Sequence, residues 1–149
     1  MKNRGLLGTC MLMCMLFLIT KNYAQDTTNS VVHTQSDQSL QWGPCPDFMP
    51  DGCQIAILHG DPAKKNTDLF FKVPANTDIP NHSHTSVERM VLVSGEMEVT
   101  YEGEETQKIK TGNYAFGPAK KPHTAKCGDA GPCVLFIAFE EPLDAFYEE

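Results

Sequence analysis

The sequence predicts a single all-β domain, built as a sandwich or barrel of short strands. Two observations indicate this fold class. Between Gln54 and Phe139, short apolar runs are separated by turns rich in glycine and proline, and no helical period extends beyond a couple of turns. The chain has 149 residues, of which 41% are hydrophobic, which is enough for one buried core.

The N-terminal segment, residues 1–24, has the order of a secretory signal peptide. Two basic residues precede an apolar run from Leu6 to Ile19, and a polar stretch that ends in Ala24 follows. The run is shorter than the roughly 20 residues that span a membrane. We therefore expect cleavage after Ala24 and a secreted or periplasmic protein. A lipoprotein acylated at Cys10 or Cys14 fits less well, because much of the apolar run follows Cys10.

The charge balance argues against two classes of partner. The formal net charge is −7, and removal of the signal peptide takes away three further positive charges. An acidic surface repels phosphate backbones and anionic lipids. We therefore expect no nucleic-acid partner and, after signal cleavage, no membrane partner.

Two segments connect the signal peptide to the predicted barrel. Residues 25–40 are mostly small and polar, and they are expected to form a flexible leader. Residues 41–53 contain three prolines and two glycines, which argue against a regular element, together with Trp42, Phe48 and Met49. These large apolar side chains predict an ordered arm that packs on the barrel.

The barrel itself is expected to cover residues 54–139. The expected strands are Gln54–His59, Asp68–Val73, His82–His84, Val87–Val93, Glu96–Tyr101, Gln107–Lys110, Tyr114–Phe116, His123–Cys127 and Cys133–Phe139. The acidic tail, residues 140–149, carries Leu143, Phe146 and Tyr147. We expect it to pack back on the barrel or to form a short terminal turn.

Four cysteines remain after signal cleavage, and an exported protein permits disulfide bonds. Cys45 and Cys53 are placed to close the arm into a small loop, and Cys127 and Cys133 stand at the facing ends of a predicted hairpin. Three pairings are compatible with the sequence, which does not choose among them.

His82, His84 and Glu88 form a group of candidate metal ligands. The two histidines are two residues apart, so on an extended strand their side chains point to the same face. On one continuous strand Glu88 would lie about 13 Å from His84, at about 3.3 Å per residue. The chain must therefore turn at Thr85–Ser86, and we expect Glu88 to approach the histidines from a paired neighbouring strand.

The fourth candidate ligand is His123, in the segment GNYAFGPAKKPH, and with it the chain resembles the cupin superfamily. One cupin motif is Gly, five residues, His-x-His, three or four residues, Glu, six residues, Gly, and it is fitted by His82, His84, Glu88 and Gly95. The second is Gly, five residues, Pro-x-Gly, two residues, His, three residues, Asn, and it is fitted by Gly112, Pro118 and His123.

Three motif positions depart from this pattern. Asn76 and Lys120 stand where the motifs have glycine, and Cys127 stands where the second motif has asparagine. All four metal-ligand positions are nevertheless filled. The resemblance covers most of the chain after the signal peptide, and the Trp-Gly-Pro arm is similar to that of a group of small exported cupins.

The resemblance implies a double-stranded β-helix, or jelly-roll barrel, with one divalent transition metal bound by His82, His84, Glu88 and His123. Three imidazoles and one carboxylate suit Fe, Mn, Zn, Ni, Cu or Co. The resemblance also implies a small-molecule ligand or substrate, oxygenase- or isomerase-type chemistry at the ion, and a homodimer. The alternative is a cupin without catalytic activity that binds a metal or ligand or acts as a sensor.

Five apolar residues are candidates for the wall of a ligand pocket: Phe71, Met90, Leu92, Phe116 and Phe136. Met90 and Leu92 share the strand parity of Glu88, so we expect them to face inward with it. Ordinary core packing explains the other three equally well. No acid, base or nucleophile beyond the four candidate ligands stands out in the sequence, which favours chemistry performed by the metal.

Overall fold

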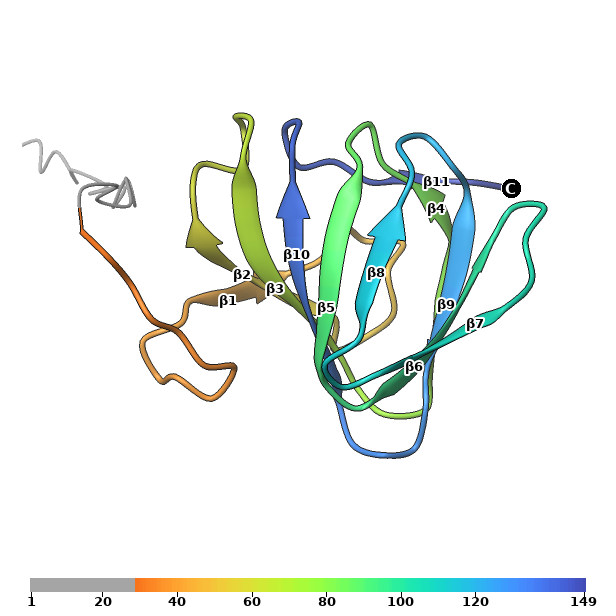
Figure 1. The fold of residues 1–149 in the computed structure, drawn as a ribbon, viewed down its shortest axis with the longest axis horizontal. Coiled ribbons are helices and arrows are strands. Elements are labelled where there is room, and N and C mark those ends of the chain that lie inside the picture. Colours follow the sequence, from red (N-terminus) through yellow and green to blue (C-terminus); the bar gives the residue numbers. More distant parts are fainter. Residues whose placement is uncertain (1–28) are drawn as a thin grey trace, which may run out of the picture.

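Eleven strands form the described part of the chain, residues 29–149, in a computed structural model (Figure 1). The predicted signal peptide and the start of the leader lie outside these residues. The strands are β1 (Trp42–Pro44), β2 (Gln54–His59), β3 (Thr67–Val73), β4 (Thr77–Ser83), β5 (Glu88–Ser94), β6 (Glu96–Tyr101), β7 (Gln107–Lys110), β8 (Tyr114–Gly117), β9 (His123–Cys127), β10 (Cys133–Phe139) and β11 (Phe146–Tyr147).

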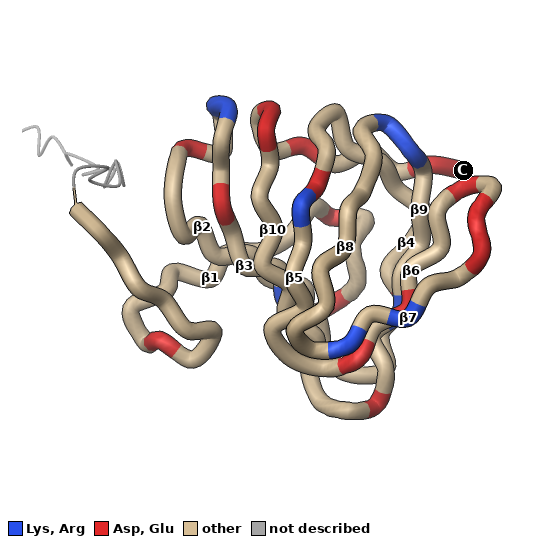
Figure 2. Tube along the Cα trace, viewed as in Figure 1, with Lys and Arg blue, Asp and Glu red and all other residues tan. Residues whose placement is uncertain are grey.

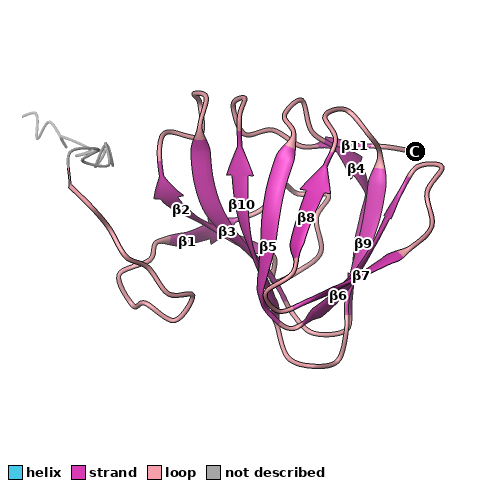
Figure 3. Ribbon diagram, viewed as in Figure 1, coloured by secondary structure: helices cyan, strands magenta, loops and turns pink. Residues whose placement is uncertain are grey.

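The strands form two antiparallel sheets that enclose the barrel interior. One sheet has the order β1-β2-β3-β10-β5-β8, and the other has the order β11-β4-β9-β6-β7. Figure 3 shows strands and loops throughout the described chain. Within residues 29–149, no helix is long and apolar enough to cross a membrane. The prediction of an all-β barrel is confirmed.

Two strands extend or correct the predicted elements. The arm contributes β1, although its prolines argued against a regular element; Pro44 is tolerated because β1 is an edge strand that pairs only with β2. Strand β4 begins at Thr77, well before the predicted start at His82. The sequence pattern did not predict the first part of this strand because Pro80 interrupts it. The pairing of β4 with β9 shifts register between Ile79 and His82, and this shift accommodates the proline.

Glu88 does not come from a strand paired with β4. Strand β5 lies between β10 and β8 in the six-stranded sheet, whereas β4 lies between β11 and β9 in the other sheet. The chain therefore turns after His84, as expected, but it crosses from one sheet to the other. Glu88 and the histidines consequently face each other across the barrel interior.

The six-stranded sheet buries apolar side chains on both faces. The inner face contributes Leu69, Val73 and Leu92 to the main core between the sheets. The outer face carries a second cluster of Leu40, Ala56, Leu58, Phe70 and Val134. Trp42 of the arm stacks on Phe70 with ring centroids 6.5 Å apart, so this part of the arm packs on the outside of the barrel.

Two disulfide bonds tie the ends of neighbouring segments together. Cys45 pairs with Cys53, and Cys127 pairs with Cys133, with Cα–Cα distances of 5.6 and 5.8 Å. Of the three pairing schemes that the sequence allowed, the structure contains the one in which both bonds are local. Each closes a short loop, which is worth about 2.5 kcal/mol in the chain-entropy model.

The acidic tail packs back on the barrel. Strand β11 pairs with β4 at Ser83 and His82, and Leu143 packs against the main core. The Ser86 hydroxyl accepts hydrogen bonds from the backbone of Glu140 and Glu141. Figure 2 shows the acidic residues of this tail and the basic residues scattered along the barrel. The tail is thus held beside the segment that carries the candidate ligands.

Candidate metal centre

Three buried histidines converge inside the barrel. Their ligand atoms all lie within 4.8 Å of one another. His82 is on β4, and His84 follows that strand directly. His123 begins β9 and is paired with His82 in the sheet. The pairing of β4 with β9 therefore brings together residues that are far apart in sequence.

Each of these imidazoles is held by a backbone carbonyl through Nδ1. A carbonyl oxygen only accepts hydrogen bonds, so each Nδ1 carries the proton and each neutral ring has its lone pair on Nε2. Such contacts fix the tautomer and orientation that a metal ligand requires. The three contacts are His82 Nδ1 to Pro80 O at 2.8 Å, His84 Nδ1 to Asp144 O at 2.5 Å, and His123 Nδ1 to Lys121 O at 3.1 Å.

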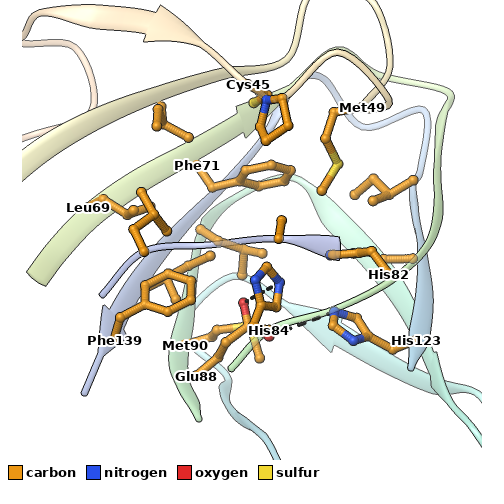
Figure 4. Close-up of a pocket in the computed structure, with 18 of the residues that line it drawn as sticks. Cys45, Met49, Leu69, Phe71, His82, His84, Glu88, Met90, His123 and Phe139 are labelled. Atoms are coloured by element: carbon orange, nitrogen blue, oxygen red, sulfur yellow. Dashed lines mark ion pairs between the residues drawn. The ribbon is translucent and has the colours of Figure 1, made fainter. Parts of the chain in front are cut away.

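Glu88 flanks the three histidines from the opposite sheet (Figure 4). Its Oε1 lies 3.5 Å from His84 Nε2, and its Oε2 lies 3.7 Å from His123 Nε2. Two atoms that each bind one ion at about 2.1 Å lie at most about 4.2 Å apart. The separations between Glu88 and these two nitrogens therefore fit a shared ion, and the donor set suits a divalent transition metal.

Burial lowers the pKa of two of the imidazoles, those of His82 and His123. Desolvation, followed by the neighbouring His123 and His84, lowers the pKa of His82 to about 3. Desolvation is also the largest cause that lowers the pKa of His123. A neutral imidazole is the form that binds a metal, so both rings have their lone pairs available at physiological pH.

At two of the three positions where the sequence departs from the motifs, the backbone still adopts a conformation that favours glycine. Asn76 has a φ of 56° and Lys120 a φ of 59°, both in the left-handed region. The backbone N–H of Lys120 donates to the carbonyl of His84 over 2.7 Å. The non-glycine residue at 120 thus keeps the turn that connects the His123 segment to the His84 segment.

A cavity of about 350 Å³ lies against the histidines and Glu88. Its walls come from both sheets and are mostly apolar. The arm adds Pro44, Cys45, Pro46 and Met49, and the tail adds Leu143, Asp144 and Ala145. The two terminal segments therefore complete a cavity that the barrel strands alone would leave less enclosed.

The predicted pocket residues are distributed over three environments. Phe71 and Met90 line the cavity. Leu92 faces inward as its parity predicted, but it lies fully buried in the core at 0% exposure and is not part of the cavity wall. These three residues lie on the inner side of the six-stranded sheet.

Phe116 and Phe136 do not line the cavity, and the prediction is corrected for both. Phe116 is 51% exposed and lies opposite Arg89 in the β5–β8 pair, so it shares the outward face of Arg89. Phe136 packs against the second cluster on the outer face of the sheet. Both residues were chosen because they are apolar, but the face of the sheet that each one occupies is determined by the strand register.

Tyr101 is a residue that the sequence reasoning missed. It ends β6, lies opposite His123 in the β6–β9 pair, and its ring centroid is 4.7 Å from that imidazole. Its hydroxyl is buried and has no hydrogen-bond partner in the described chain. Burial, and next the nearby Glu88 carboxylate, raises the pKa of Tyr101, so the hydroxyl keeps its proton. The alternation of Met97, Val99 and Tyr101 was the available signal, since it places a polar tip at the end of an inward-facing stripe.

An antiparallel double-sheet barrel of this kind is the jelly-roll architecture. The family model described as "Cupin domain" matches residues 69–139. This match places a cupin domain at residues 69–139 and confirms the resemblance to the cupin superfamily seen in the two motifs. A search of curated proteins finds no match.

Solved structures with related barrels include three informative neighbours. The DMSP lyase DddQ from Ruegeria pomeroyi is 20% identical, with a TM-score of 0.63 over 72% of this chain and 60% of that one. The polyketide cyclase RemF from Streptomyces resistomycificus is 16% identical, with a TM-score of 0.65 over 80% of this chain and 87% of that one. A cupin 2 conserved barrel domain protein from Rhodopseudomonas palustris is 13% identical, with a TM-score of 0.61 over 74% and 79% of the two chains. At these identities the likeness shows the fold, and this chain spans less than two thirds of the lyase.

Proposed function

We propose that the protein is an exported cupin that uses one divalent transition metal, held by His82, His84, His123 and Glu88, to bind or transform a small molecule. The observation that carries the proposal is the fixed orientation of the imidazoles. Each Nδ1 proton is directed to a backbone carbonyl, so three lone pairs remain on a cluster of buried Nε2 atoms.

The residues of the site have separate tasks. The neutral imidazoles supply donor atoms without adding charge, and the Glu88 carboxylate offsets part of the charge of a divalent cation. The apolar walls limit the access of water to the site. An ion with open coordination positions polarises a substrate oxygen or activates dioxygen or water. This combination is the basis for proposing oxygenase- or isomerase-type chemistry.

Two neighbours with similar barrels are named as enzymes, a lyase and a cyclase, and they make catalysis the leading version of the proposal. A binding protein without catalysis is the second version. It is favoured by the chemistry of the described cavity wall, which holds no lysine, serine or threonine, and whose Cys45 is engaged in a disulfide bond. Tyr101 is the wall's remaining unassigned proton donor.

Export is part of the proposal and is supported by the cysteines. Both disulfide bonds join residues in short loops, and such bonds persist in extracellular or periplasmic compartments. Mass spectrometry of the mature protein would test the signal peptide directly. A mature N-terminus after Ala24 supports export, and an intact N-terminus in the cytoplasm contradicts it.

Metal analysis of protein purified from its native compartment tests the metal site. The wild type should contain about one equivalent of metal, and His82→Ala and His123→Ala should each lose it. His59→Ala is the matched control, because His59 is an exposed histidine at the end of β2 and lies outside the cavity. Equal metal content in all four proteins, or none in the wild type after loading, would contradict the proposal.

Oxygen uptake and product formation across candidate substrates separate the two versions. Turnover that disappears in His123→Ala supports the enzyme. Ligand-induced thermal stabilisation of the metal-loaded protein without any turnover supports the binding protein.

A further inference from the structure

We propose that the cavity accepts a predominantly apolar small molecule with a single oxygen-bearing head group, and that the Tyr101 hydroxyl hydrogen-bonds this head group beside the histidines. This inference rests on the proposed metal site and names the class of ligand that the site takes. Two independent features carry it, which are the chemistry of the cavity wall and the unpartnered hydroxyl.

The cavity wall separates polar from apolar groups. The imidazoles, Glu88 and Tyr101 account for almost all of its polar side chains. The other acidic side chain, Asp144, is already engaged, since its carbonyl accepts from His84 and its Oδ1 accepts from the backbone N–H of Thr85. The remaining wall is aliphatic, aromatic or sulfur-containing and includes Cys45, Met49, Phe71, Met90 and Met97.

The charge of the wall limits the charge of the ligand. Among the described residues that line the cavity, none is a lysine or an arginine. A second carboxylate or a phosphate on the ligand would therefore be buried without a cationic partner, which is strongly unfavourable. One oxygen-bearing group at the polar end is compatible with the wall, and a polyanionic ligand is not.

The size and softness of the apolar wall fit a small organic body. A volume of about 350 Å³ is at the lower end of the range typical of small-molecule pockets. Met49, Met90 and Met97 line it, and methionine side chains adapt to irregular apolar surfaces. Figure 4 shows Phe71 and Met49 between Cys45 of the arm and the polar residues. The body of the ligand would occupy this apolar region.

The Tyr101 hydroxyl is the group that lacks a partner. The residue is 5% exposed, and its oxygen makes no hydrogen bond within the described chain. Buried hydroxyls are normally hydrogen-bonded, because leaving one unpaired is unfavourable. Tyr101 lines the cavity and lies opposite His123 in the sheet. A ligand head group at the polar end supplies the missing partner.

Gly117 shows how close this hydroxyl is to the candidate ligands. A Cβ atom at that position would lie 2.5 Å from the Tyr101 oxygen and 2.9 Å from Glu88 Oε2. The hydroxyl and the carboxylate therefore share the narrow space beside Gly117, with no side chain there to separate them. A head group that reaches the ion is within reach of Tyr101 as well.

Three hydroxamates that share one head group test the predicted ligand class. Zinc-loaded wild-type protein would be titrated by calorimetry with octanohydroxamate, acetohydroxamate and the octano compound that carries a carboxylate at its far end. We expect octanohydroxamate to bind about 100-fold more tightly than acetohydroxamate, because each buried methylene favours binding. The carboxylate analogue should bind at least about tenfold more weakly than octanohydroxamate. Equal affinities for all three compounds, or preference for the carboxylate analogue, would overturn the inference.

Tyr101→Phe tests the hydroxyl separately. Loss of one hydrogen bond to the head group should weaken octanohydroxamate binding about tenfold. The Tm of the ligand-free variant should be equal to or above that of the wild type, since an unpartnered buried hydroxyl is removed. Tyr114→Phe is the control, because Tyr114 is 63% exposed and lies outside the cavity. Unchanged affinity in Tyr101→Phe would overturn the role of Tyr101.

A zinc titration without hydroxamate distinguishes failure of this inference from failure of the proposed function. If wild-type protein binds no zinc or other divalent transition metal, the proposed metal site fails, and this inference fails with it. If metal binds stoichiometrically and the hydroxamates show no preference for the long chain, only the ligand class proposed here is overturned.

Discussion

The two ends of the cavity are built in opposite ways. At the polar end, each imidazole donates to a backbone carbonyl, so its orientation is fixed by the main chain. At the apolar end, the wall includes Phe71 of β3 and Met49 of the arm, which Figure 4 shows between Cys45 and the polar residues. The difference indicates that geometry is constrained where an ion would bind and adaptable where the body of a ligand would lie. Substitutions at the two ends should therefore differ in kind.

The largest effect is expected at the polar end, from Glu88→Gln. The substitution keeps the shape of the side chain and removes the only carboxylate, among residues 29–149, that forms close pairs with two of the clustered imidazoles. We expect zinc affinity to fall about 100-fold in a calorimetric titration. Glu98→Gln serves as the control, because Glu98 pairs with Lys108 on the surface. Equal zinc affinity in Glu88→Gln and the wild type would remove Glu88 from the metal site.

The next largest effect is expected from removal of the disulfide bond in the arm, at the apolar end. The double variant Cys45→Ser/Cys53→Ser should lower the free energy of unfolding by about 2.5 kcal/mol in a urea titration. Zinc affinity should stay within a factor of two or so, because the disulfide supplies no candidate ligand atom and the carbonyls that orient the three imidazoles lie outside the arm. A parallel loss of zinc affinity would show that the two ends of the cavity are coupled.

The pH dependence of stability sharpens the description of the polar end. The pKa of His82 is lowered to about 3 in the folded state, so between pH 6.5 and pH 3 the unfolded state binds the extra proton. Stability of the metal-free protein is therefore fully present above pH 6.5 and falls as the pH drops from there. We expect a loss of about 1 kcal/mol per pH unit from this group, measured by urea titration between pH 7 and pH 5. His82→Gln should show a shallower dependence, and an unchanged slope would contradict the burial of a neutral His82.

The smallest effect is expected from Met90→Leu, in the apolar wall. The two side chains have similar volumes, so the free energy of unfolding should change by less than about 1.5 kcal/mol. Zinc affinity should be unchanged in the same calorimetric assay. A loss of zinc affinity comparable to that of Glu88→Gln would show that the wall also determines the geometry of the ion.

The local sequence pattern was sufficient to predict most of the strands of the fold. The strands β2, β6, β7, β9 and β10 have the predicted bounds, because each is a short segment between clear turn signals. Strand β4 was underestimated because Pro80 interrupts its pattern, and the register shift beside it is a tertiary feature. The crossing of Glu88 to the opposite sheet also depends on strand order, which alternation alone does not report.

The candidate site, like the fold, was predicted only in part from the sequence. Motif spacing predicted that His82, His84 and His123 belong to one group, and the structure brings them together with Glu88. The carbonyl partners of the imidazoles, the contribution of Asp144 and the position of Tyr101 could not be predicted. His82 and His123 use carbonyls only two residues away, but the sequence pattern does not report the direction of those carbonyls. The Asp144 carbonyl and the position of Tyr101 depend on segments that meet only in the folded barrel, such as the tail against the turn after His84.

X-ray absorption spectroscopy of the zinc-loaded protein tests the central claim most directly. The proposed site predicts a first shell of nitrogen and oxygen atoms at about 2.0–2.2 Å, with the outer-shell scattering of three imidazoles. His123→Ala should remove one imidazole from that pattern or abolish binding. A sulfur shell at about 2.3 Å, or a bound zinc without imidazole scattering, would contradict a metal centre formed by these histidines and Glu88.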